Sequence, residues 1–255
     1  AAAGLPLALP FAARSLASQE GPGALATFNY AWKLVELPLL LAVQLVATLA
    51  LGPIAQAFAR ASSREEAAGT VRRGFALAFT LACACAAGLL VAAPAVADLL
   101  FGWGRMQDDA LRQVAQWARL AAWGLLPQAL TAIALSVLAA QGRMWPPVAA
   151  YAAALLLLVT QGPGEGAELM LWLNWLWAGV CLASLWALRH GLGIWLPRRA
   201  LGVAGGALVV LATLLAWTGA PAHLPLQFAA GAVAALVVLG LTWSASPDLR
   251  AALRR

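Results

Sequence analysis

The sequence contains little charge. Asp, Glu, Lys and Arg make up 10% of its 255 residues, against about 25% in a soluble domain, whereas hydrophobic residues make up 63%. This composition excludes an ordinary soluble globular domain. A net charge of +6 would favour a nucleic-acid partner in a soluble protein. Here most basic residues lie in short gaps between apolar runs, so membrane topology and anionic lipid headgroups explain the charge, and no nucleic acid is expected as a partner.

The sequence also lacks the residue groupings that carry most enzyme chemistry. Its three cysteines and two histidines form no cluster at metal-ligand spacing, so neither a metal site nor a cofactor is expected. No Ser/His/Asp arrangement and no glycine-rich phosphate loop is found. Polyprenyl transferases resemble one another in paired Asp-rich motifs, and this sequence has only Asp108-Asp109. We therefore expect a protein that is not an enzyme.

Long apolar runs are abundant, and the arginines are distributed unevenly among the gaps between them. A spanning helix needs about 20 mostly apolar residues, and most of the runs meet this length. Eleven of the 16 basic residues lie in every second gap or in the tail, whereas the intervening gaps hold only Arg105 and Arg112. Cytoplasmic loops carry the Lys/Arg excess, so the arginine-rich gaps and the carboxyl end are expected in the cytosol. The runs cover residues 1–17, 24–58, 74–100, 113–141, 145–161, 168–188, 201–218 and 225–245.

These runs are expected to be helices. A lipid-exposed backbone must satisfy its own hydrogen bonds, and no period-2 barrel pattern appears. The predicted fold class is therefore all-α, a polytopic transmembrane helical bundle of about eight spans. Pro38, Pro94 and Pro127 fall inside three of the runs, where proline can kink a membrane helix. Pro38 stands out because charged residues precede it.

The residues before Pro38 form the main candidate site. If their helix enters the hydrocarbon near residue 25, Lys33 lies eight residues, or ~12 Å, inside the membrane. Asn29 and Glu36 share its helical face by their spacing. A charge at the bilayer centre costs about 3 kcal/mol, so Lys33 should face a partner or a wet cavity. Lys33 and Glu36 then form either a self-neutralising ion pair or a cationic stripe for an anionic substrate group. Arg14, four residues before a polar loop, either snorkels outward or joins the cavity.

Three stretches resemble one family of membrane transporters. Residues 24–59 contain a Tyr-Ala pair, a basic residue, a carboxylate and two prolines, namely Tyr30-Ala31, Lys33, Glu36, Pro38 and Pro53. This pattern resembles the eighth spanning segment of the MurJ/MviN lipid II flippases, whose superfamily also contains the multidrug MATE exporters. Residues 99–106, LLFGWGRM, resemble the family's loop after its ninth span. Residues 138–147, LAAQGRMWPP, resemble its link into the eleventh span.

The resemblance implies an architecture. The chain would hold spans seven to fourteen, which form the C-terminal lobe of a MATE-like flippase plus two extra helices. Residues 1–189 would form the six-helix lobe, with its first helix truncated. Residues 190–255 would form the two additional transmembrane helices and a cytosolic tail. The amino-terminal lobe that completes such a transporter lies outside this sequence.

The resemblance also implies a function. The protein would translocate lipid II, the polyprenyl-pyrophosphate-linked peptidoglycan precursor, across the bacterial inner membrane by alternating access between two lobes. Lys33 would meet the pyrophosphate, and Glu36, Asn29 and Arg14 would be the other substrate-binding residues. The implied partners are lipid II, membrane lipids and the amino-terminal lobe.

The sequence departs from the family pattern in two places. Trp32-Lys33 stands where the family usually shows an acidic residue followed by arginine, and lysine offers a point charge in place of a bidentate fork. The run 145–161 holds no carboxylate or asparagine for a sodium site. Two other functions stay open from the residues alone: a flippase for another lipid-linked oligosaccharide, and a transport-dead membrane scaffold.

Overall fold

The structure is a computed structural model, and it describes residues 5–21, 23–60, 64–104, 106–163 and 166–253. Within these ranges the chain is built of helices and turns and has no strand. The predicted all-α class is confirmed. The elements are α1 (Leu5–Ala17), α2 (Ala24–Pro38), the π-helix η2 (Leu39–Gln44), α3 (Leu45–Arg60), α4 (Arg64–Phe101), α5 (Asp108–Ala122), α6 (Leu125–Ala140), α7 (Trp145–Gln161), α8 (Gly166–Ala187), α9 (Leu192–Trp195), α10 (Arg198–Thr218), α11 (Leu224–Ala245) and α12 (Pro247–Leu253).

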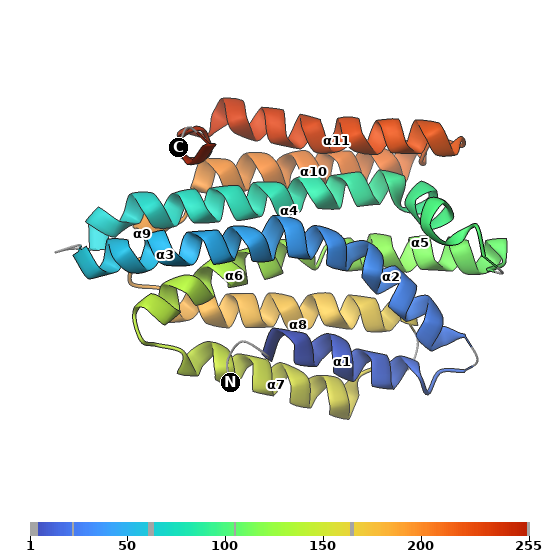
Figure 1. Ribbon diagram of the computed structural model, residues 1–255, viewed down its shortest axis with the longest axis horizontal. Coiled ribbons are helices and arrows are strands. Elements are labelled where there is room, and N and C mark those ends of the chain that lie inside the picture. Colours follow the sequence, from blue (N-terminus) through green and yellow to red (C-terminus); the bar gives the residue numbers. More distant parts are fainter. Residues whose placement is uncertain (1–4, 22, 61–63, 105, 164–165, 254–255) are drawn as a thin grey trace.

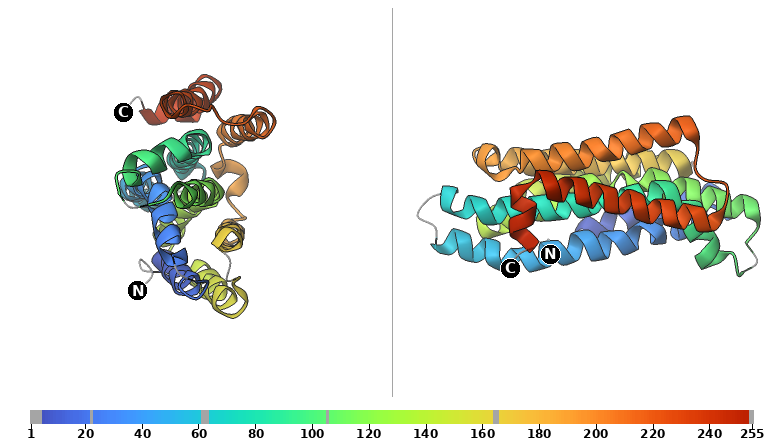
Figure 2. Two further views of the ribbon diagram at one scale, coloured as in Figure 1. Left: turned by 90° about the vertical axis from the view of Figure 1, so that its right-hand side faces the viewer. Right: turned by 90° about the horizontal axis from the view of Figure 1, so that it is seen from above.

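Helix α4 lies at the centre of the bundle. It packs against α3, α5 and α6 on one side and against α10, α11 and α12 on the other (Figure 1). In its most apolar stretch, 72% of the helix is buried inside the protein, against 17% for α10 and 22% for α11. Figure 2 shows α10 and α11 at one edge of the bundle and α1 and α7 at the opposite edge. Helices α10 and α11 therefore expose most of their apolar surface to the surroundings.

Small residues bring α11 close to α4. A Cβ atom added to Gly231 would lie 2.7 Å from the Cβ of Ala92 and 3.0 Å from the carbonyl oxygen of Gly88. Gly88 and Ala92 are four residues apart, so they occupy one face of α4. Such small-residue faces let the backbones of two membrane helices approach closely, and the resulting van der Waals packing favours their association.

The arginine-rich turns lie together. Figure 1 shows the last turn of α3, the first turn of α4, the turn between α6 and α7, the short helix α9 and helix α12 at the same end of the bundle. The turns between α1 and α2, α4 and α5, α7 and α8, and α10 and α11 lie at the other end. The alternation seen in the sequence thus corresponds to two opposite ends of one helical bundle.

The helices are more fragmented than the predicted eight runs. In the described ranges, α4, α8, α10 and α11 are long and apolar enough to cross a membrane, and the bent pair α5–α6 makes a fifth candidate. The apolar helices in α1 and α7 are shorter, and the run 24–58 is divided by η2. The proposed division at residue 189 remains a prediction.

Prolines account for two of these interruptions. Pro38 has no N–H to bond the carbonyl of Leu34, and a π-helical segment begins directly after it. Pro127 likewise leaves the carbonyl of Trp123 without its usual partner, and the chain bends by 42° between α5 and α6 at Trp123 and Gly124. Next to this break, the side chain of Asn174 on α8 satisfies a backbone carbonyl: its Nδ2 donates to the carbonyl of Leu120 at 2.7 Å.

Pro94, in contrast, lies inside the continuous helix α4. The backbone N–H of Ala95 donates to Oε1 of Gln227 on α11, over 3.1 Å. On the neighbouring turn, the carbonyl of Val91 accepts from the guanidinium of Arg119 at 3.5 Å. Backbone groups next to a membrane proline are re-satisfied in this way by neighbouring helices. Gln227 and Arg119 thus bond backbone groups beside Pro94, and α4 continues through this proline.

Candidate functional site

Helix α2 carries three of the four predicted site residues, and its packing determines where they lie. Its buried face consists of Thr27, Phe28, Ala31, Trp32, Leu34 and Val35. Phe28 and Trp32 are one turn apart with parallel rings, and Tyr30 packs against Phe101 at the end of α4 with ring centroids 4.6 Å apart. The buried face and the contact of Tyr30 with Phe101 hold α2 against the bundle, so the opposite face of the helix is left outside the core.

Lys33 lies on that outer face. Its side chain is exposed, and Glu36, one turn further, is half-buried. Among the residues that the structure describes, neither side chain has an ion-pair or hydrogen-bond partner. The self-neutralising ion pair that the sequence left open is therefore not formed in this structure. An unpaired ammonium group near membrane depth requires water or an anion beside it.

Asn29 and Arg14 are half-buried near the same outer turn. Asn29 lies one turn before Lys33 on α2. Arg14 lies in the last turn of α1, and its guanidinium carbon is 5.1 Å from the ring centroid of Phe11. The Nε atom of Arg14 is buried without a hydrogen-bond partner. In the described ranges no hydrogen bond or ion pair joins any two of the four predicted residues. They occur on two helices connected by one short turn.

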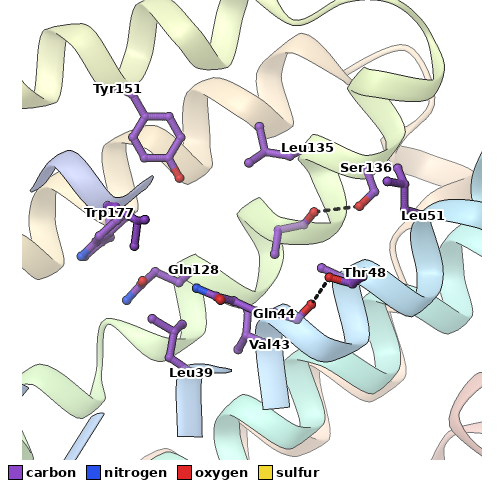
Figure 3. Close-up of a pocket in the computed structure, with 13 residues that line it drawn as sticks. Leu39, Val43, Gln44, Thr48, Leu51, Gln128, Leu135, Ser136, Tyr151 and Trp177 are labelled. Carbon is purple, nitrogen blue, oxygen red and sulfur yellow. Dashed lines mark hydrogen bonds between the residues drawn. The ribbon is translucent and has the colours of Figure 1, made fainter. Parts of the chain in front are cut away.

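A cavity of about 410 Å³ lies further along the same helix. It is bounded by α1, η2, α3, α6, α7 and α8, and its lining begins at Leu39, six residues or about 9 Å of helix rise beyond Lys33. Figure 3 shows the side chain of Gln44 pointing towards Gln128, with the hydroxyl of Tyr151 directed between them and Leu135. The cavity lining contains no ionisable group other than this phenol.

The hydrogen bonds in the cavity leave several polar groups available. Gln128 uses its Nε2 for the carbonyl of Gly124, so its Oε1 stays open. Thr48 and Ser136 each donate to a carbonyl one turn back on their own helix. Tyr151 is 4% exposed, and its hydroxyl has no hydrogen-bond partner in the described part of the chain. The cavity therefore offers neutral hydrogen-bonding groups among apolar walls.

This cavity was not predicted from the sequence. Gln44 and Thr48 are in the same apolar run as Lys33, and their four-residue spacing could have indicated a polar face. Gln128 and Tyr151 come from helices far along the chain, and no sequence pattern brings them to Gln44. The π-helix also changes which residues of α3 share a face with Lys33, because it adds a residue to the turn.

The family model described as "Lipid II flippase MurJ" matches residues 10–246. The chain belongs to the MurJ family. This membership and its long apolar helices make it an integral membrane protein, and the resemblance seen in the sequence is confirmed. No curated protein matches the chain.

Among solved structures, the chain is similar to one titled "Lipid II flippase MurJ, inward closed conformation". The TM-score is 0.76 at 12% sequence identity, and the likeness covers 95% of this chain. At that identity the likeness shows the MurJ fold and not its residue roles. The chain spans 52% of the length of the solved MurJ protein, so it is similar to about half of it.

Proposed function

We propose that this chain forms the C-terminal half of a flippase that moves lipid II across the bacterial inner membrane. The observation that carries the proposal is the family match over residues 10–246. The arginine-rich end of the bundle would face the cytosol, together with the carboxyl end, because basic residues are retained on that side. The other partner would be an amino-terminal lobe that rocks against this one in alternating access.

Lys33 would bind the pyrophosphate of the substrate. Its exposure and its lack of a partner support this role, since a paired ammonium group would have little field left for an anion. Glu36 would orient the ammonium group or partly neutralise it. Asn29 and Arg14, which lie towards the same outer turn, would add a hydrogen-bond donor and a second positive charge.

The neutral cavity would receive an uncharged part of the headgroup. Sugar hydroxyl and amide groups need donors and acceptors and no counter-ion, which matches Gln44, Gln128 and Tyr151. A cationic drug would instead require a carboxylate, and the lining of this cavity has none. A cationic group at Lys33 followed by a neutral polar cavity therefore fits a lipid whose anionic phosphates carry a sugar.

The test is transport by the intact protein in which Lys33 is replaced. Lys33→Ala is expected to abolish growth of a flippase-depleted strain and the flipping of labelled lipid II in vesicles. Lys33→Arg is expected to preserve both, because the positive charge remains. Arg143→Ala, which removes an exposed arginine from the turn between α6 and α7, is the matched control and should behave as wild type. Normal flipping by the Lys33→Ala protein would reject the proposed role.

A further inference from the structure

The π-helix η2 connects the two parts of the candidate site. Lys33 and Glu36 lie before it on α2, and Gln44, its last residue, lines the cavity. π-turns are rare, and those that occur are often found at functional sites. The position of η2 between the charged residues and the cavity therefore requires an explanation.

The wider π-turn determines which residues face the cavity. Leu39 and Gln44, five residues apart, both line it (Figure 3). Five residues correspond to ~50° around a π-helix but to ~140° around an α-helix, so an α-helix would place these two side chains on different faces. Beyond η2 the lining continues with Thr48 and Leu51. The hydroxyl of Thr48 donates to the carbonyl of Gln44, at the end of the π-helix, over 2.8 Å.

The chain is anchored on both sides of this segment. Before it, the buried face of α2 holds that helix against the bundle. After it, Ile54 of α3 is fully buried, and Phe58 meets Trp195 edge to face with ring centroids 5.7 Å apart. Residues 39–51 lie between these two anchors, so a change within them need not move either one.

A proline interrupts the hydrogen-bond ladder at each end of the segment. Pro38 precedes η2 and Pro53 follows Leu51 by two residues, and neither has an N–H to bond the carbonyl one turn earlier. Gly52, next to Pro53, is exposed, and a Cβ atom there would meet nothing within 4 Å. The second proline therefore combines an incomplete ladder with open space, and a wider turn needs both.

The segment presents a small residue to the central helix. A Cβ atom added to Gly74 of α4 would lie 3.8 Å from the Cβ of Ala50 and 3.5 Å from Cγ2 of Ile133 on α6. Because Gly74 and Ala50 meet without a long side chain on either helix, nothing at this contact interlocks them. Packed helices can slide past each other at contacts of this kind.

We propose that the extra residue of η2 migrates along the helix from Pro38 to Pro53 and so switches the wall of the cavity. Each residue that it passes rotates by ~100° about the helix axis and advances by ~1.5 Å. The ladder exchanges i→i+5 for i→i+4 bonds on one side of the migrating turn and the reverse on the other, so no backbone group is left free. Helix register shifts of this kind take microseconds to milliseconds.

This migration removes polar groups from the cavity. Each residue at the wall is replaced by the residue before it, so Val43 takes the place of Gln44 and Ala47 takes that of Thr48. An amide and a hydroxyl thus leave the cavity, and apolar side chains replace them. One register binds a polar headgroup and the other releases it. This reading as binding and release rests on the proposed function, whereas the migration itself is measured without transport.

The experiment labels single cysteines with a water-soluble thiol reagent. It uses the intact protein in lipid nanodiscs, with its three native cysteines replaced by alanine. Val46 is 8% exposed and does not line the cavity, but after the migration it takes the place of Ala47, which does. Val46→Cys is therefore expected to react slowly but measurably. Gln44→Cys, at an exposed position in the present register, is expected to react fast.

Deletion of Leu40 removes the extra residue. Its side chain is 44% exposed, so the deletion takes nothing from the core and leaves a regular α-helix with α3 in its present orientation. The deletion is expected to slow the labelling of Val46→Cys about tenfold, because the second register is lost, and to leave that of Gln44→Cys unchanged. Leu40→Ala removes the same side chain at unchanged chain length and is the matched control, so it should not slow either reaction.

A disulfide tests the same movement at unchanged chain length. Cβ atoms 3.8 Å apart suit a disulfide, so Gly74→Cys and Ala50→Cys can be joined in the present register. The bond holds position 50 against α4 and prevents the migration. Oxidation is expected to slow hydrogen–deuterium exchange in peptides covering residues 39–51 about tenfold relative to the reduced form of the same protein. Peptides from α11 serve as the control and should exchange equally in both forms.

Three results would overturn the proposal. The first is equal labelling of Val46→Cys with and without Leu40, and the second is equal exchange of residues 39–51 in the oxidised and reduced proteins. The third is failure of the disulfide to form, which would show that Ala50 does not lie against Gly74. If the deletion variant does not fold, the disulfide decides alone. Because none of these measurements uses transport, they stand apart from the test of Lys33.

Discussion

Oε1 of Gln227 accepts a hydrogen bond from the backbone N–H of Ala95, 132 residues earlier in the chain, over 3.1 Å. The same amide donates through Nε2 to the carbonyl of Pro221 at 2.8 Å. One side chain thus joins the central helix α4, next to Pro94, to the turn that leads into α11. Because the hydrocarbon core contains no water to bond a free backbone N–H, a partner from the protein must satisfy it.

Removal of this amide is expected to loosen α11. Gln227→Leu leaves the Ala95 N–H without its acceptor, at a cost of about 1 kcal/mol, as for other hydrogen bonds between membrane helices. The apparent melting temperature in detergent should fall by about 3 °C. Gln56→Leu, at an exposed position of α3, is the control and should not lower it.

The close contact between α4 and α11 predicts sensitivity at one glycine. Gly231→Leu would place side-chain atoms against Ala92 and the Gly88 carbonyl, and overpacking of this kind costs about 1–3 kcal/mol. Thermal unfolding should report the loss. Gly240→Leu on the same helix enters open space and serves as the control. Equal melting temperatures of the two variants would show that α11 does not pack on α4 through Gly231.

Glu36 separates the two interpretations of the charged stripe. Because it forms no ion pair with Lys33 in this structure, Glu36→Gln is expected to leave the melting temperature within about 1 °C of wild type, as for surface changes. If the two residues instead neutralised each other inside the membrane, the variant would strand a buried charge and unfold several degrees lower. The measurement is thermal unfolding in detergent without substrate.

A larger side chain at Ala132, which lines the neutral cavity, would fill part of it. Ala132 of α6 lines it and Ala139 of the same helix is exposed, so Ala132→Phe and Ala139→Phe are a matched pair. We expect Ala132→Phe to lower lipid II flipping at least tenfold and Ala139→Phe to leave it unchanged. Flipping at the wild-type rate by a folded Ala132→Phe protein would remove the cavity from the transport pathway.

The orientation of the bundle predicts which loops react from outside. In an intact-cell assay, Cys at Ala222, between α10 and α11, should be labelled by an impermeant thiol reagent. Cys at His190, between α8 and α9, should be protected until the membrane is opened. The native Cys83, Cys85 and Cys181 are replaced by alanine for this assay. The reverse pattern would invert the proposed topology.

The placement of Lys33 shows how much of the candidate site can be predicted from the sequence. Helical spacing predicts that Asn29 and Glu36 share a face with Lys33. In the structure Lys33 is exposed, whereas Ala31, Leu34 and Val35 are buried. The same spacing could not show whether Lys33 pairs with Glu36, because both side chains have several rotamers within reach of each other. Their roles in binding stay a prediction.

Local signals in the sequence determined the class of this protein: apolar runs of membrane length, arginines in alternate gaps, and a motif around Pro38 typical of one family. These signals depend on neighbouring residues and survive without a folded structure. Only the tertiary structure decided which prolines interrupt a helix and which polar side chains share a cavity. Pro94 lies within the continuous helix α4, where Gln227 and Arg119 bond backbone groups beside it, whereas the chain bends just before Pro127, where Asn174 bonds a freed carbonyl. These three side chains come from helices that meet their partners only in the folded bundle.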